Sequence, residues 1–168
     1  MHASYRRQIE GLLDGGVDAL LVETCQDPLQ IRCAVHAALH ALEARGMGPE
    51  QLPIMVSVTV ETTGTLLVGS EISAVASTLR RLPVASLGLN CATGPAEMTP
   101  HVEWLAKHWD RPISVVPNAG LPILVDGRTE YPLQAAPMAE RMSGFVGDLG
   151  VSMIGGCCGT TTEHIGAC

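Results

Sequence analysis

The sequence predicts an α/β fold that forms part of a (β/α)8 TIM-type barrel. Apolar runs typical of buried parallel strands alternate with amphipathic helical patterns along all 168 residues. The expected strand ends, Glu23, Thr59, Cys91, Asn118 and Cys157, are 36, 32, 27 and 39 positions apart. An eight-unit barrel of about 250 residues uses roughly 31 residues per unit, so we expect about five of the eight βα units, the C-terminal ones, in a single domain.

Five short apolar runs predict the strands. A parallel strand that is covered on both faces reads as a continuous apolar run and not as an alternating one. In chain order the predicted strands are Val17–Glu23, Pro53–Val60, Ala85–Asn90, Pro112–Pro117 and Val151–Gly155.

Amphipathic patterns predict helices before, between and after these strands. In chain order they are Ser4–Asp14, a helix that Asp27 caps and Gly46 ends, residues 72–82, one that opens at Gly94-Pro95 and one that opens at Pro137. Thr160 and Glu163 have the spacing of a capping box, which predicts the start of a last helix.

The composition excludes several classes of protein. A formal charge of −7 gives no basic surface for nucleic acid or an anionic membrane. The longest stretch without a charged side chain, Leu82–Ala96, falls short of the roughly 18 residues that a membrane-spanning helix needs. No secretory signal follows the N-terminus, so we expect a cytoplasmic, reducing location, where the six cysteines are thiols or metal ligands.

The polar residues at the predicted strand ends are the candidates for function, because the reactive groups of a βα barrel lie at the carboxyl ends of its strands. They are Glu23, Thr24, Ser57, Thr59, Asn90, Cys91, Asn118, Cys157 and Cys158. Three of the six cysteines are therefore expected on one rim.

The Cys157-Cys158 pair is the most informative of these features. Adjacent thiols can reach one metal only if the strand has ended in a turn, which the flanking Gly155-Gly156 and Gly159 permit. With Cys91 they would form a three-sulfur zinc site with one open position, the arrangement typical of catalytic zinc. Simple buried thiols and a strained vicinal disulfide are the alternatives that the spacing leaves open.

Two other features are ambiguous in the sequence alone. Glu23 ends an otherwise apolar strand, so its carboxylate is either paired within the protein or free to bind a cationic ligand. His36 and His40 lie one helical turn apart and could bind a metal, although a solvated helix surface is the more common explanation.

The same residues carry a family resemblance. The segments Val22–Thr24 with Asp27, Gly88–Pro95, Pro117–Pro122 and Gly155–Thr161 resemble, in order and over nearly the whole chain, the motifs of the homocysteine S-methyltransferase family. The form Pro-Asn-Ala-Gly-Leu-Pro around Asn118 resembles the homocysteine-binding domain of cobalamin-dependent methionine synthases more than the betaine-dependent or S-methylmethionine-dependent members.

The resemblance implies a zinc-dependent transfer of a methyl group to the thiol of homocysteine, forming methionine. It implies that Cys91, Cys157 and Cys158 bind Zn²⁺ and that Asn118 occupies the fourth position when substrate is absent. It also implies that Glu23 binds the ammonium group of homocysteine, and that Ser57 and Thr59 lie close to the substrate. The alternative is a non-catalytic zinc or thiol module.

The resemblance further implies that methylcobalamin, on another domain or chain, donates the methyl group, so the partners are homocysteine and the cobalamin and folate domains of a parent enzyme. The family's first three βα units, with a glycine-containing substrate loop, have no counterpart here. We therefore expect a fragment that is inactive or weakly active alone, and that associates with itself through open barrel edges.

Overall fold

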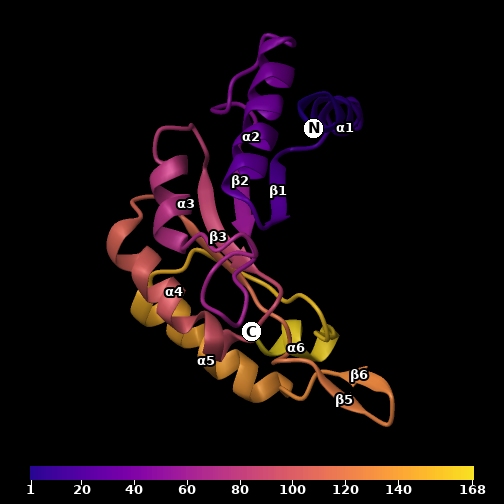
Figure 1. The fold of residues 1–168 in the computed structure, drawn as a ribbon, viewed down its shortest axis with the longest axis vertical. Helices are drawn as coiled ribbons and strands as arrows, with labels where there is room; N and C mark the ends of the chain where they lie inside the picture. The colour runs from indigo at the N-terminus through magenta and orange to yellow at the C-terminus, as the bar shows by residue number, and fades with distance from the viewer.

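The computed structural model describes residues 1–168 and contains six helices and seven strands (Figure 1). In chain order they are α1 (His2–Asp14), β1 (Leu20–Cys25), α2 (Pro28–Glu43), β2 (Ile54–Val58), α3 (Ile72–Leu79), β3 (Ser86–Asn90), α4 (Pro95–His108), β4 (Ile113–Val116), β5 (Ile123–Val125), β6 (Arg128–Glu130), α5 (Ala135–Leu149), β7 (Met153–Ile154) and α6 (Thr162–Ala167). No helix among them has both the length and the apolar character needed to cross a membrane.

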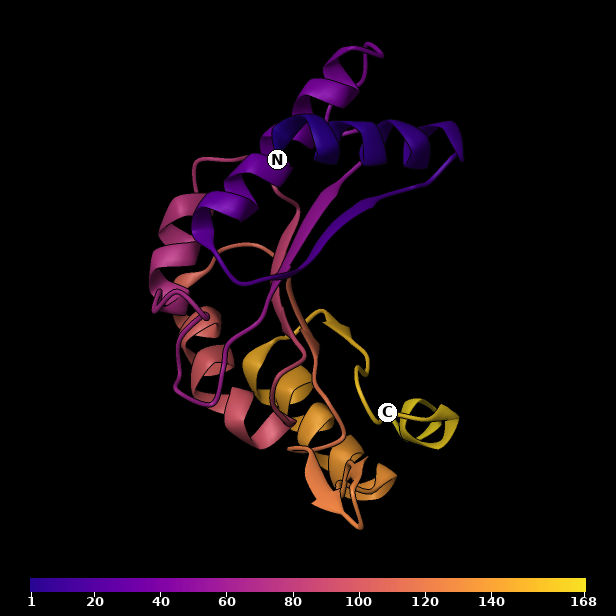
Figure 2. The ribbon, with the colours of Figure 1, turned by 45° about the vertical axis from the view of Figure 1, so that its right-hand side comes forward.

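Strands β1, β2, β3, β4 and β7 form one parallel sheet in that order, as the predicted βα alternation requires. Helices α2 to α5 lie along one side of this sheet, and the whole forms an open arc (Figure 2). The predicted α/β fold with five parallel strands is confirmed, and the arc is that of part of a βα barrel.

The two faces of the sheet differ in chemistry because neighbouring residues of a strand point to opposite sides. Val56, Leu87 and Ile113 are in register across β2, β3 and β4 and belong to the apolar core under the helices. On the opposite face Ser57, Gly88 and Ser114 are in register, so its centre is lined by small side chains, with Met153 beside them on β7. This face corresponds to the inside of the barrel. The candidate functional residues lie where its strands end.

Three predicted helix starts are wrong by one or two residues. Helix α1 begins at His2 and not at Ser4. Helix α5 begins at Ala135 and not at Pro137, because proline is tolerated anywhere in the first turn, where the N–H has no partner within the helix. Helix α6 is capped by Thr161 with His164 and not by Thr160 with Glu163. The Thr160 hydroxyl instead donates a hydrogen bond to the Cys157 carbonyl oxygen, at 2.7 Å.

The hairpin of β5 and β6 has no counterpart among the predicted elements. Its two strands pair antiparallel around Asp126 and Gly127, both of which have positive φ. Asp-Gly between two extended runs is the typical signal of such a turn. The hairpin projects from the loop between β4 and α5 and is exposed, and Tyr131 follows it directly.

Strand β1 lies at one edge of the sheet, with β2 as its only neighbour. Leu21, on the barrel-interior side of β1, is 48% exposed. We predict that the 168-residue chain alone associates through this edge, since an open edge offers unpaired backbone groups and apolar side chains to a second copy. Light scattering at micromolar concentration should detect the association.

The variant Leu21→Lys is expected to reduce this association, because a charge on an edge strand opposes pairing with another strand. Val146→Lys on α5 is the matched control, since Val146 is also exposed, at 45%, but lies on a helix with no open backbone edge. Equal effects of the two substitutions would contradict association through β1.

Candidate metal centre at the carboxyl ends of the strands

Cys91, Cys157 and Cys158 meet at the carboxyl ends of β3 and β7, and their sulfur atoms all lie within 4.8 Å of one another. The Cys158 sulfur is 3.8 Å from that of Cys91 and 3.9 Å from that of Cys157. Zinc binds thiolate sulfur at about 2.3 Å, which in a tetrahedron separates two sulfurs by about 3.8 Å. The cluster therefore has the donor type and the spacing of three ligands to one zinc ion.

The backbone turns sharply where each thiol is presented. Cys91 and Ala92 have φ of 61° and 57°, a left-handed conformation that costs energy in residues other than glycine. Hydrogen bonds hold this turn, from the Cys91 N–H to the Val116 carbonyl at 3.2 Å and from the Thr93 N–H to the Cys91 carbonyl at 2.7 Å. The expected chain turn at Cys157-Cys158 is also present, closed by the Thr160 N–H bonding to the Cys157 carbonyl at 3.1 Å.

The electrostatics of the cluster disfavour free thiolates. Burial, and next the nearby Cys91, raise the pKa of the Cys157 thiol to about 12. Three negative sulfurs at this spacing would repel one another, and without a cation the Cys157 thiol keeps its proton at neutral pH. A bound cation removes this repulsion and displaces the protons.

Asn118 follows β4 and contacts the cysteine turn directly. Its side chain is 3% exposed, and its Oδ1 accepts a hydrogen bond from the Cys158 N–H at 3.0 Å. An amide oxygen has two lone pairs, so a second one remains for a further partner. Asn118 thus helps to hold the turn, and a role as metal ligand stays a prediction.

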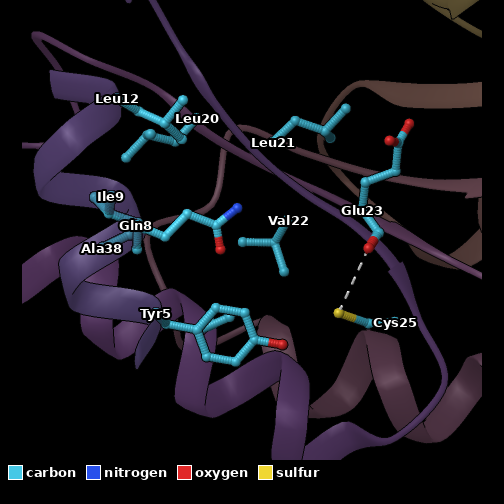
Figure 3. Close-up of a pocket in the computed structure, with 11 residues that line it drawn as sticks. Tyr5, Gln8, Ile9, Leu12, Leu20, Leu21, Val22, Glu23, Cys25 and Ala38 are labelled. Atoms are coloured by element: carbon cyan, nitrogen blue, oxygen red, sulfur yellow. Dashed lines mark hydrogen bonds between the residues drawn. The ribbon is translucent and has the colours of Figure 1, made fainter. Parts of the chain in front are cut away.

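Glu23 lies on β1 and is exposed, and neither of the two ion pairs in the structure involves it. In Figure 3 its side chain points away from the groove that Tyr5, Val22 and Cys25 line beneath the strand. The sequence left open whether the Glu23 carboxylate is paired within the protein or free. In the structure it is unpaired and lies on the barrel-interior side. Whether it binds an ammonium group stays a prediction.

Ser57 and Thr59 lie at the end of β2, each only 2% exposed. Both hydroxyls donate to Asn90, Ser57 to its Oδ1 at 2.7 Å and Thr59 to its carbonyl oxygen at 3.2 Å. Their hydroxyls thus have partners within the protein, and contact with substrate stays a prediction.

Asn90 connects Ser57 and Thr59, although its side chain was not among those expected to bind substrate or metal. The sequence feature that could have indicated this role is its position directly before Cys91, at the polar end of an apolar strand.

The other cysteines are separate from this cluster. Cys25 is buried in the core, and burial, with a smaller contribution from Asp27, raises its thiol pKa to about 11. Cys33 lies on α2 and Cys168 is exposed at the end of the chain. His36 and His40 also lie on α2, where His40 contacts His2, with 3.1 Å between their ring nitrogens.

A sequence profile of homocysteine S-methyltransferases matches residues 1–168. The chain belongs to the homocysteine S-methyltransferase family. Within the family it is 52% identical over 162 residues to the methionine synthase of Mycobacterium leprae and 50% identical over 162 residues to that of Mycobacterium tuberculosis. Each match covers 96% of this chain but only 13% of the relative.

Solved structures of the homocysteine methyltransferase MmuM from Escherichia coli have the same fold as this family member. The oxidized form has a TM-score of 0.70 at 24% identity and the apo form 0.72 at 25% identity. Both matches cover 99% of this chain, and they cover 51% and 54% of the respective MmuM chains. The chain thus spans about half of these structures, in agreement with the expected partial barrel.

Proposed function

We propose that residues 1–168 form the C-terminal part of a homocysteine-binding (β/α)8 barrel domain, which activates the thiol of homocysteine for methyl transfer and so forms methionine. The observation that carries the proposal is the convergence of Cys91, Cys157 and Cys158, from two separate strand ends, at the spacing that zinc requires. Family membership and the methionine synthase relatives support homocysteine as the substrate.

In this proposal the three cysteines hold Zn²⁺ and leave one position for the substrate sulfur. A free thiol with a pKa of about 8.5 is only roughly 3% ionised at pH 7, and zinc bound here supplies the positive charge that keeps the thiol as thiolate. Glu23 binds the ammonium group of homocysteine and so fixes its orientation. Once the thiol is ionised, no general base is needed. The thiolate attacks the methyl carbon and forms the S–C bond, while the bond between that carbon and the methyl donor breaks and its electron pair stays on the donor.

The methyl donor must come from outside these residues. The chain spans 13% of the length of the methionine synthase relatives, so their remaining sequence has ample room for carrier domains. We propose methylcobalamin on another domain or chain as the donor, with the cobalamin and folate domains of a parent enzyme as partners. Betaine or S-methylmethionine is the alternative, and a methyl-transfer assay that compares the three donors separates them.

We also propose a cytoplasmic, reducing location. The six cysteines, none of which forms a disulfide, support it.

The decisive experiment is zinc X-ray absorption with and without homocysteine. We predict that homocysteine adds a fourth sulfur to the zinc in place of Asn118 or water, and that binding releases a proton because the substrate thiol must ionise. Calorimetry in buffers of different ionisation enthalpy measures that proton. Unchanged zinc coordination and no proton release would instead indicate a structural zinc module.

A further inference from the structure

The Asn90 side chain joins three strand ends. Its Oδ1 accepts hydrogen bonds from the Ser57 hydroxyl at 2.7 Å and from the Thr24 N–H at 3.3 Å, and its Nδ2 donates to the Thr24 hydroxyl at 2.8 Å. Asn90 is itself 1% exposed. One buried amide therefore links the end of β3 to the ends of β1 and β2.

Only an amide satisfies all three of these groups. It offers one oxygen that accepts two hydrogen bonds and one nitrogen that donates. A carboxylate would lack the donor and add a buried charge. An apolar side chain would leave the buried Ser57 hydroxyl without a partner where water does not easily replace it, and would remove both contacts to Thr24.

Residues on both sides of this link have unfavourable backbone conformations. Thr24 directly follows Glu23 and has φ of 56°, a left-handed conformation that a β-branched residue rarely adopts. Asn90 holds both the N–H and the hydroxyl of Thr24 in that conformation. Cys91 directly follows Asn90 and has φ of 61°. The amide thus lies between the turn after Glu23 and the turn that presents the first thiol.

We propose that Asn90 is a positioning residue that fixes the distance between the Glu23 carboxylate and the metal-binding thiols. This inference rests on the proposed function, in which one small substrate must place its ammonium group at Glu23 and its sulfur at the metal. Such a substrate gains from both contacts only if the two are held at the right separation. Asn90 acts through Thr24 and Cys91 and does not itself contact the substrate.

The test compares how tightly the natural polypeptide and its variants bind two thiol compounds. Homocysteine uses both contacts, whereas 4-mercaptobutyrate lacks the amino group and uses only the metal. We expect Asn90→Ala to keep its zinc and to weaken homocysteine binding about tenfold, the size of one or two buried hydrogen bonds. Binding of 4-mercaptobutyrate should change less than about twofold, because it does not depend on Glu23.

Ser86→Ala is the matched control. Ser86 lies on the same strand, four residues before Asn90, and its buried hydroxyl has no hydrogen-bond partner. This variant should bind both thiols as the wild type does. Thr24→Val is a second test variant for the case that Asn90→Ala does not fold, since it removes only the hydroxyl that Asn90 contacts, on an exposed residue. It should weaken the binding of homocysteine by about threefold and leave the binding of 4-mercaptobutyrate unchanged.

Each outcome decides the inference. A selective loss of affinity for homocysteine in Asn90→Ala, or in Thr24→Val, supports it. Equal weakening of both thiols, or unchanged binding of homocysteine, overturns it and leaves Asn90 with a purely structural role. A wild type that binds zinc without adding a homocysteine sulfur would overturn the proposed function itself, and the zinc absorption measurement reports that separately.

Discussion

Cys158→Ala is expected to abolish tight zinc binding and, with it, methyl transfer to homocysteine. The Cys158 sulfur is the central one of the cluster, within 3.9 Å of both other sulfurs. Removing a group that merely orients a metal ligand costs 10–100-fold in affinity or activity, so removing one of three ligands should cost more than about 100-fold. Cys91→Ala should behave in the same way.

Zinc content after dialysis, measured by mass spectrometry, and methionine formation by the natural polypeptide check this expectation. Cys33→Ala is the matched control, because Cys33 lies on α2 outside the cluster and should keep full zinc. Stoichiometric zinc with unchanged sulfur coordination in Cys158→Ala would mean that the cysteines do not hold the metal.

The sequence predicted the sheet and the cysteine cluster for the same physical reason. Continuous apolar runs such as Pro53–Val60 mark parallel strands, and β2 lies inside that range. Parallel strands end on one side of a sheet, so Cys91 and Cys157 were expected on a common rim although 66 positions separate them. The structure brings their sulfurs, with that of Cys158, within 4.8 Å.

Side-chain partners were harder to predict than strands. Ser57 and Thr59 were expected near the substrate because they end a strand, yet a strand-end position does not tell whether a hydroxyl faces a ligand or a neighbouring strand. Both donate to Asn90, a contact that depends on the register of β2 against β3. The edge position of β1, on which the exposure of Glu23 depends, was predicted from the count of βα units and not from a local pattern.

Gly88→Ala is expected to destabilise the fold by about 3 kcal/mol or more. Gly88 lies in the middle of β3 and is paired with Ser57 on one side and Ser114 on the other. A Cβ at this position would overlap both the Ser114 hydroxyl oxygen and the Ser114 carbonyl oxygen. Overpacking in a core usually costs 1–3 kcal/mol, and here the obstacle includes backbone that the pairing of β3 with β4 holds in place.

Limited proteolysis of the natural polypeptide across a urea series measures this loss of stability. Gly155→Ala is the control, because a Cβ there would meet only the Val116 methyl groups at 3.5 and 3.6 Å, an ordinary contact, and should be close to neutral. Ser114→Gly in the Gly88→Ala background should restore only part of the stability, since it removes the hydroxyl but leaves the carbonyl oxygen. Full restoration would show that the side chain alone excludes a residue larger than glycine, and an unchanged urea midpoint in Gly88→Ala would contradict the close approach of β3 and β4 itself.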